Sequence, residues 1–252
     1  MAELKDITAF LDRELKHSEI QDYPGAMNGL QLDNSGSVER VIAAVDATLP
    51  VIEKAAEQGS GSLLIVHHGM FWQGAQPVTG AFHRKLKVAM EANMAIYSSH
   101  LPLDVHPQWG NNALLAARLG LENTSDFLDF KGLPVGLQGA WSGSADALKG
   151  QLEEILEGPV HFSPGGPEKI ERVGVVTGGA GSEVEKAAAS GVDAFVTGEG
   201  PHWSYGLAEE LGIHLFYGGH YATETFGVKA LGEVLEAKFG SLYTFLDHPS
   251  GL

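Results

Sequence analysis

The chain has 252 residues, of which 32 are acidic and 16 are basic, and its formal net charge at pH 7 is −16. Apolar residues make up 44% of the chain and charged residues 19%, a balance that indicates a folded globular protein and excludes a disordered one. The acidic excess disfavours bulk nucleic-acid binding, because proteins that bind phosphate backbones gain affinity from clustered lysine and arginine.

The sequence contains no cysteine, which excludes disulfides, thiolate nucleophiles and metal centres with sulfur ligands. Any bound metal must therefore be held by nitrogen and oxygen atoms, and the 11 histidines provide candidates. No apolar run approaches the roughly 20 residues that cross a bilayer, and the N-terminal segment lacks the apolar block of a signal peptide. We therefore expect a cytoplasmic protein with no membrane partner.

Hydrophobic periodicity in the first half predicts alternating helices and strands. An amphipathic helix comes first, and the strand after it is a nearly continuous apolar run of the kind that is buried on both faces in a parallel sheet. Asn111 is the expected N-cap of the last helix in this half. The predicted helices span residues 6–16, 50–58, 83–92 and 111–119, and the predicted strands span 40–47, 62–66 and 94–98.

The second half repeats this plan. A buried strand is predicted over 170–177, and the helix after it is expected to begin with a capping box formed by Ser182 and Glu185. Order, spacing and predicted element type agree between the halves at shifts of 132 and 120 residues, which we interpret as an internal duplication. The longer shift aligns the strand end at His67 with the strand end at Glu199, and the shorter one aligns His100 and Asp104 with His220 and Glu224.

The predicted fold class is therefore α/β, built from two linked, pseudo-repeated α/β lobes. The first lobe is expected to comprise residues 1–127 and the second residues 128–252, with the stretch 126–139 as the approximate boundary. Ligands of parallel α/β sheets bind at the carboxyl ends of the strands. We therefore expect the lobes to face each other with the functional site between them.

Three predicted strands end in polar groups that can bind a metal. His67 and His68 end one strand, and Gly69 permits the turn that would bring both imidazoles to one site. His220 and Glu224 are four residues apart at the expected start of a long helix, where their side chains would lie about 5–6 Å apart on one face. The third strand end contains His100 and Asp104.

His100 and Asp104 have the same spacing as the helical pair, but Pro102 favours a loop there. Taken alone, a His-His pair is usually a capped turn or a half-buried pair, and a lone His-x-x-x-Glu is usually a surface pair. Together, at strand ends of a cysteine-free chain, these features predict one or two divalent transition-metal ions. Zinc, manganese, iron, cobalt and nickel all suit such donors.

With these residues, the chain resembles the GTP cyclohydrolase I type 2 homologue family, also called the NGG-interacting-factor-like proteins. The resemblance spans almost the whole chain. Many relatives have Thr-Asn where this chain has Leu101 and Pro102, a variant expected to alter the loop but to leave Asp104 in place. The matching motifs are NGLQ at 28–31, VHHG at 66–69, HLPLD at 100–104 followed by GNN at 110–112, TGE at 197–199 and GHYATE at 219–224.

The resemblance implies two linked α/β lobes with a dinuclear metal site between them, and a ring-shaped homohexamer whose metals face an inner cavity. Glu224 is the residue best suited to bridge both ions. The metal ligands that the resemblance implies are His67, His68, Asp104, His220 and Glu224.

Two further residues are candidates for catalytic proton transfer. His100 is not among the usual family ligands, and it would act either in proton transfer beside the metals or in a purely structural role; as the counterpart of His220 it could also be a ligand. Glu199 lies at the strand end equivalent to His67. Glu199 and His202 would either line a substrate cavity or cap a helix.

Other features have a structural and a functional explanation. The glycine-rich segment 177–182 could hold a phosphate on its backbone N–H groups, but it lacks the P-loop lysine, and a simple tight turn is the favoured interpretation. Trp72, Trp109 and Trp203 lie near site motifs and could stack on a base, although packing or a subunit interface is the favoured role.

The leading hypothesis is a metal-dependent hydrolase of a nucleotide or a related phosphorylated or cyclic-amide substrate, because paired ions orient a substrate and activate water. In this hypothesis His100 or Glu199 moves protons. The family name suggests GTP ring opening, although no motif in the sequence recognises a guanine. The alternative is a non-catalytic protein that binds or delivers metal, or that serves as a scaffold. The expected partners are further copies of the chain and a small, nucleotide-like molecule.

Overall fold

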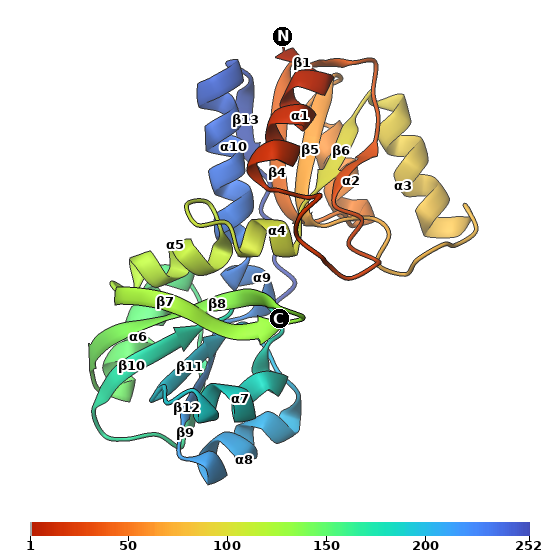
Figure 1. Cartoon of the computed structure of the whole chain (residues 1–252). Coiled ribbons are helices and arrows are strands. Elements are labelled where there is room, and N and C mark those ends of the chain that lie inside the picture. Colours follow the sequence, from red (N-terminus) through yellow and green to blue (C-terminus); the bar gives the residue numbers. More distant parts are fainter. Residues whose placement is uncertain (1) are drawn as a thin grey trace. The chain divides into compact units, whose positions relative to one another are not determined.

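The computed structural model describes residues 2–252, and the chain forms two compact units, each with its own sheet (Figure 1). The first unit contains the residues up to Leu103 together with Gly227–His248, and the second contains Asp104–Phe226 together with Pro249–Leu252. The division predicted after residue 127 differs from these units. It falls inside strand β7, which pairs with β8 to form an antiparallel hairpin where a boundary was expected.

The first unit is a five-stranded sheet with the strand order β13-β4-β5-β6-β2. Strands β13, β4, β5 and β6 are parallel, and β2 is antiparallel to β6. A separate pair is formed by β1 and β3. The strands are β1 (Ala2–Glu3), β2 (Gly29–Leu32), β3 (Ser37–Val38), β4 (Arg40–Asp46), β5 (Ser62–His68), β6 (Ala95–Ser98) and β13 (Leu242–Phe245), and the helices are α1 (Leu4–Glu14), α2 (Leu49–Ala56), α3 (Gly80–Glu91) and the part of α10 (Thr225–Phe239) from Gly227 onward.

Helices cover both faces of this sheet, as the apolar run of β4 predicts (Figure 1). On one face, Ile42 of β4 and Leu64 of β5 pack with Ile52 of α2 and Ala89 of α3. The helices α1 and α10 lie on the opposite face, where α1 buries Ile7 and Leu11. Alternate residues of each parallel strand are therefore buried against different helices.

The second unit is a six-stranded sheet with the strand order β7-β8-β10-β11-β12-β9. Strands β10, β11 and β12 are parallel, and the remaining strands pair in antiparallel fashion. The strands are β7 (Glu122–Phe130), β8 (Leu133–Gly143), β9 (His161–Pro164), β10 (Ile170–Val175), β11 (Ala194–Thr197) and β12 (His214–Tyr217), and the helices are α5 (Asn111–Arg118), α6 (Ala145–Leu156), the 3₁₀ helix η1 (Gly181–Glu183), α7 (Val184–Ala189), α8 (His202–Leu211) and α9 (His220–Thr223).

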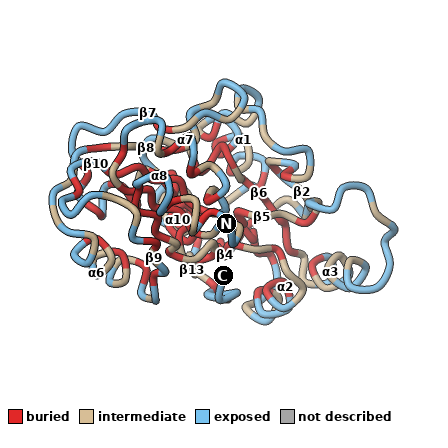
Figure 2. The backbone as a smooth tube through the Cα atoms, turned by 90° about the horizontal axis from the view of Figure 1, so that it is seen from below, coloured by how far each residue is buried: buried red, intermediate tan, exposed pale blue. Residues whose placement is uncertain are grey.

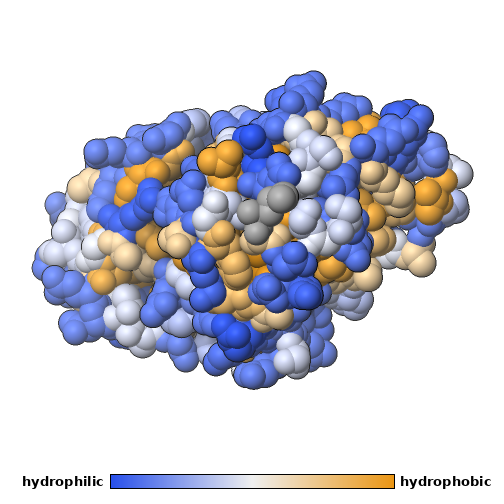
Figure 3. All heavy atoms as spheres, turned by 90° about the horizontal axis from the view of Figure 1, so that it is seen from above, coloured by the Kyte–Doolittle hydropathy of each residue, from blue (hydrophilic) through white to orange (hydrophobic). Residues whose placement is uncertain are grey.

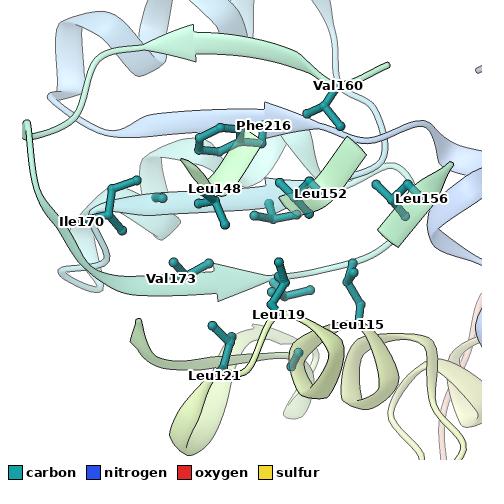
Figure 4. Packing of buried hydrophobic residues seen from close by; sticks show 14 of the residues in the cluster. Leu115, Leu119, Leu121, Leu148, Leu152, Leu156, Val160, Ile170, Val173 and Phe216 are labelled. Carbon is teal, nitrogen blue, oxygen red and sulfur yellow. The ribbon is translucent and has the colours of Figure 1, made fainter. Parts of the chain in front are cut away.

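The core of the second unit lies on both faces of its sheet. Leu148, Leu152 and Leu156 project from α6 at helical spacing onto β10 and β12, where they meet residues such as Val173 and Phe216 (Figure 4). A second cluster on the other face joins residues of α7 and α8 to β11 and β12. Buried residues follow the strands and inner helix faces, whereas the connecting loops are exposed (Figure 2). The mixed α/β fold class is confirmed.

Two predicted helix starts are wrong. The N-cap of α5 is Gly110, and Asn111 is the first residue of the helix, because its side chain donates a hydrogen bond to Asp104 instead of capping. Ser182 lies in the 3₁₀ helix η1, and α7 starts at Val184 without a side-chain cap, so the predicted capping box does not form.

Two backbone expectations at site motifs are also wrong. Pro102 does not enforce a loop: residues Leu101–Asp104 form the short helix α4, and a proline in the first turn of a helix costs no hydrogen bond. The helix expected to run on from His220 is interrupted at Glu224, between α9 and α10.

Across the described residues, no helix combines the length and the apolar character needed to cross a bilayer. On the face seen in Figure 3, hydrophobic residues reach the surface in separate small patches within a larger hydrophilic area. Large exposed apolar side chains include Trp72 in the first unit and Trp203 in the second.

Candidate functional site

The first unit gathers three histidines at the carboxyl ends of β5 and β6. Strand β5 runs through both His67 and His68, and the centroids of these two rings lie 4.8 Å apart. The ring of His100, just after β6, lies 4.9 Å from that of His67 and 5.7 Å from that of His68. One nitrogen from each imidazole lies within 4.8 Å of the others. This spacing is compatible with donors that share one or two cations.

All three imidazoles are oriented through the same ring atom. His67 Nδ1 lies 2.9 Å from the backbone oxygen of Ser99, and His68 Nδ1 lies 2.8 Å from Asp46 Oδ1. His100 Nδ1 likewise lies 2.9 Å from an oxygen of Asp22. These oxygens only accept hydrogen bonds, so each Nδ1 carries a proton, and in the neutral form of each ring the lone pair is on Nε2. Metal-binding histidines in proteins are commonly oriented in this way.

Asp22 is the anchor of His100, and sequence reasoning missed it. Its Oδ1 accepts hydrogen bonds from His100 Nδ1 and from the backbone N–H of Tyr23 at 2.6 Å, and its Oδ2 accepts from Asn28 Nδ2 at 2.8 Å and the Leu101 N–H at 2.9 Å. Burial raises the pKa of Asp22, but the hydrogen bond and charge of His100, with the other donors, outweigh it and lower this pKa. Asp22 is therefore a buried carboxylate that holds the His100 ring.

Gln31 stabilises the turn that follows His67 and His68 through hydrogen bonds. Its Oε1 accepts a hydrogen bond from the Met70 N–H at 2.7 Å, and its Nε2 donates to the backbone oxygens of Ala26 and Met27. A Cβ atom at Gly69 would overlap the Gln31 amide, so a larger residue there would displace that amide from its hydrogen bonds. These contacts join the NGLQ and VHHG segments.

Two of the three tryptophans near the site motifs pack on histidine rings, and the third is exposed. The Trp72 ring meets that of His100 edge-on, with centroids 4.7 Å apart. Trp109 stacks on His106 at 4.4 Å, with the ring planes 9° apart. Trp203 lies on α8 and is 54% exposed.

In the second unit, His220 lies between two carboxylates. Its Nδ1 is 2.9 Å from Glu199 Oε1, and its Nε2 is 3.2 Å from Glu224 Oε2. Burial lowers the pKa of His220, but Glu224 and Glu199 together outweigh burial and raise this pKa to about 9. The ring therefore attracts a proton in the absence of a cation, and a cation bound by the same groups would compete with that proton.

Asp104 belongs to the same unit and is held by the two asparagines that follow it. Asn111 Nδ2 donates to Asp104 Oδ1 at 2.7 Å, and Asn112 links the Asp104 backbone oxygen to the Thr177 N–H at the end of β10. Carboxylate oxygens of Asp104 and Glu224 lie within 4.8 Å of each other. Asp104 is 7% and Glu224 2% exposed. Two buried carboxylates this close repel each other unless a cation or a proton neutralises them.

The glycine-rich segment 177–182 is a tight turn, as the favoured interpretation predicted. Its N–H groups donate to oxygens of this unit: Gly178 to Thr223 Oγ1, Ala180 to Thr197 Oγ1 and Gly181 to the Glu199 backbone. A Cβ atom at Gly178, where φ is +70°, would overlap the Glu224 carboxylate. The turn therefore leaves space for the Glu224 carboxylate, and these N–H groups already donate to oxygens of the same unit.

Both units thus carry histidines and carboxylates at the ends of parallel strands, which defines a cysteine-free α/β protein with nitrogen and oxygen ligands suited to a metal ion. The chain belongs to the Duf34/NIF3 (NGG1p interacting factor 3) family, whose model matches residues 2–248. The resemblance inferred from the motifs is confirmed.

Curated relatives carry the name GTP cyclohydrolase 1 type 2 homolog. The protein from Halobacterium salinarum is 41% identical over 256 residues, covering 99% of this chain and 100% of the relative. The protein from Archaeoglobus fulgidus is 37% identical over 249 residues, covering 99% of each. Among solved structures, TTHA1606 from Thermus thermophilus has a TM-score of 0.91 at 34% identity, covering 100% of both chains. Reduced HcgD from Methanocaldococcus jannaschii has a TM-score of 0.85 at 26% identity, covering 98% of both.

Proposed function

We propose that the protein is a metal-dependent hydrolase that acts on a nucleotide or a related phosphorylated or cyclic-amide substrate. The name shared by its relatives points to this class of reaction. The proposal assigns two divalent ions to the chain, with zinc, manganese, iron, cobalt or nickel as candidates. The proposed ligands are His67, His68, Asp104, His220 and Glu224, with Glu224 contacting both ions.

The donor set supports this assignment within each unit. In the first unit, Ser99 and Asp46 hold His67 and His68 so that Nε2 carries the lone pair. In the second, the observation that carries the proposal is the pair of buried carboxylates Asp104 and Glu224 within 4.8 Å. Burying two negative charges this close is costly, and a divalent cation offsets that cost. Nitrogen and oxygen donors without sulfur suit the metals named above.

A divalent ion would supply Lewis acidity and lower the pKa of water. The chain's own residues would then position and move protons. His100, held through Nδ1 by Asp22, presents Nε2 as the proton acceptor, and Glu199 orients His220 while offering a second carboxylate oxygen. We therefore assign His100 and Glu199 to proton transfer.

We further propose a cytoplasmic homohexamer. The family resemblance suggests a ring, and a chain with a net charge of −16 would repel its copies unless bound cations offset part of that charge. Light scattering should give a mass close to six chains. A monomer at micromolar concentration would contradict the assembly while leaving the hydrolase proposal standing.

The test of function is metal analysis of protein purified without added metal, followed by an activity panel of nucleotides, phosphoesters and cyclic amides. Loaded protein should turn over at least one substrate, and stripped protein should lose that activity and regain it on reloading. The alternative is a protein that binds or delivers metal, or a scaffold, and exchangeable ions without turnover of any panel member would favour it. His67→Ala should lower both metal content and activity, whereas His83→Ala, on α3 of the same unit, is the matched control.

A further inference from the structure

Hydrogen bonds join the residues at the end of β6 to the end of β5, where His67 lies. The Ser99 backbone oxygen accepts from His67 Nδ1 at 2.9 Å, and the Ser99 N–H donates to the Val66 backbone oxygen at 3.0 Å. Ser98 Oγ donates to the His67 backbone oxygen at 3.2 Å. His67, Ser98 and Ser99 are all fully buried. The direction in which the His67 ring points therefore depends on the position of the Ser99 peptide.

The side chain of Ser99 has a partner far away in the sequence. Its Oγ lies 3.0 Å from Nε2 of His17, a residue 82 positions earlier. His17 follows α1, where Lys16 has a φ of +52° and turns the chain back, so that the His17 N–H donates to the Asp12 backbone oxygen at 3.3 Å. The end of α1 thus lies against the loop that holds His67.

Two oxygens fix the other side of the His17 ring. Its Nδ1 lies 3.3 Å from Asp12 Oδ1 and 3.3 Å from the Tyr97 hydroxyl oxygen. Tyr97 donates its own hydroxyl hydrogen to Asp12 Oδ1 at 2.7 Å, so both oxygens face Nδ1 as acceptors. Nδ1 therefore carries a proton, and in the neutral ring Nε2 accepts from the Ser99 hydroxyl. Burial lowers the pKa of His17 by more than Asp12 raises it, which favours the neutral ring.

An imidazole is a costly choice for this position unless its hydrogen bonds have a role. The side chain of His17 is only 10% exposed, and Tyr97 and Ser99 are fully buried. An apolar side chain would fill such a position without any hydrogen bond, whereas a buried polar group costs free energy unless it is paired. A buried network in which each member has a partner fixes a single arrangement of the groups it joins. Here the group that the network fixes is Ser99.

We propose that His17 is a positioning residue for His67. Asp12 and Tyr97 hold the His17 ring, and the ring holds the Ser99 side chain. The Ser99 carbonyl is thereby kept at His67 Nδ1, which leaves Nε2 of His67 available to a metal ion. The inference rests on the proposed function only where it assigns His67 to a metal ion, because the orientation of the ring is a property of the metal-free chain.

The first test measures the His67 tautomer in the metal-free full chain by ¹⁵N magic-angle-spinning NMR. The unaltered chain should show almost only the Nδ1–H form. His17→Leu fills the space but offers no acceptor, so it should give a mixture of tautomers. His17→Gln should restore the single form, because its amide oxygen can accept from Ser99. Phe10→Leu is the control: it changes a buried packing residue of α1 and should leave the His67 signals unchanged.

Ser99→Ala tests the same contact from its other end. It removes only the hydroxyl and should also give a mixture of His67 tautomers, so the proposal can be tested even if His17→Leu does not fold. Zinc affinity, measured by competition with a chelator, should fall about ten-fold in each variant, the lower end of the loss for groups that orient a metal-binding histidine. The double variant should lose no more than either single one, because both changes remove the same contact.

Three results would overturn the proposal: an unchanged His67 tautomer in both His17→Leu and Ser99→Ala, an equal change in Phe10→Leu, or additive losses of zinc affinity in the double variant. The outcome is separable from that of the proposed function. Tautomer changes in a chain that binds no zinc would contradict the metal site alone. Zinc binding and turnover that His17→Leu and Ser99→Ala leave intact would contradict the positioning role alone.

Discussion

The two units share a sheet plan but present different chemistry at the strand ends. In the first, β4, β5 and β6 are parallel and β2 lies antiparallel on the β6 side; in the second, β10, β11 and β12 are parallel and β9 lies antiparallel on the β12 side. The strand ends of the first sheet carry His67, His68 and His100, whereas those of the second carry Glu199, His220 and Glu224. One plan thus supplies mainly nitrogen donors in one copy and mainly oxygen donors in the other.

The same comparison explains why two different shifts were needed to align the halves. The first unit has the exposed loop 69–79 between β5 and α3, whereas only residues 198–201 separate β11 from α8. The longer loop carries Trp72, whose ring meets that of His100, whereas at the corresponding strand end of the second unit residues 198–201 line a cavity beside α8. The common strand order supports the internal duplication, and the loops give the copies different roles.

The largest expected effect is on metal binding by Glu224→Gln. The amide keeps the shape of the side chain but removes the charge, so the repulsion between Asp104 and Glu224 that a cation offsets disappears. Both proposed ions should be lost together, as measured by titration with metal and by content per chain. Glu233→Gln, at an exposed position of α10, is the control and should keep both ions. Loss of one ion alone would show that Glu224 does not contact both.

In contrast, replacing His67 or His68 by alanine should remove mainly one ion, because each imidazole offers one lone pair to one metal. His100→Ala should keep the metal content and lower the hydrolytic rate by about 10²–10⁴-fold, the cost of a lost proton-transfer group. Metal content and turnover on the same samples separate the roles. If His100→Ala loses an ion as readily as His220→Ala, His100 is a ligand like its counterpart in the second unit.

Asp22→Asn tests the anchor found only in the first unit. The amide keeps the size of the side chain, but it has one acceptor oxygen and an NH2 group where Asp22 accepts hydrogen bonds through both oxygens, so His100 Nδ1–H loses its charged acceptor and the neutral ring is no longer confined to one tautomer. Activity should fall roughly 10–100-fold, as for other residues that orient a functional histidine. The ¹⁵N shifts of His100 should report a mixture of tautomers. Asp33→Asn, at an exposed position, should change neither; unchanged His100 shifts in Asp22→Asn would refute the role.

Gly178→Ala should destabilise the second unit by about 1–3 kcal/mol, because φ is +70° and the new Cβ would overlap the Glu224 carboxylate. Thermal unfolding measures the loss, and metal affinity should fall with it because Glu224 must move. Gly191→Ala is the matched control, since it also replaces a glycine with positive φ but meets no atom within 4 Å. Equal effects of the two changes on metal affinity would contradict the proposed contact.

The smallest expected effect is a pH dependence of the first unit. Burial lowers the pKa of His17 by more than Asp12 raises it. When folding lowers the pKa of a histidine, the neutral ring contributes stability at pH values above the pKa in the unfolded state, about 6.5. This stability is lost as the pH falls from that value towards the lower pKa of the folded state. The loss should not exceed about 1.4 kcal/mol per pH unit. Chemical unfolding of metal-free protein between pH 7 and 5 should show this slope, and His17→Gln should reduce it; an unchanged slope would exclude His17 as its source.

Strand ends made the positions of several candidate residues in the fold predictable from the sequence. Apolar runs that end in His67 and Glu199 predict parallel strands whose carboxyl ends carry polar groups, and the structure has β5 and β11 there. Asp22 was not predictable, because its hydrogen bond to His100 joins residues 78 positions apart and the loop around it has no periodic pattern. The role of Asn111 was not predictable either. Its amide donates a hydrogen bond to the Asp104 carboxylate, which is a stronger partner than the helix end provides.

The unit boundaries failed for a related reason. The duplication suggests a single division between two consecutive halves of the chain. Instead, β13 returns from the C-terminal region to pair with β4, and β7 and β8 extend the second sheet where the boundary was expected. Strand pairing between distant segments depends on tertiary contacts that local pattern does not encode.

The central claim is that histidines fixed through Nδ1 and the paired buried carboxylates hold two divalent ions. Anomalous X-ray diffraction at the absorption edge of the metal found by elemental analysis tests it most directly, on crystals of the loaded protein. We predict two peaks per chain, with the Nε2 atoms of His67 and His68 and an oxygen of Glu224 at bonding distances of about 2.0–2.2 Å. A single peak, coordination through Nδ1, or ions that do not touch Glu224 would contradict the account.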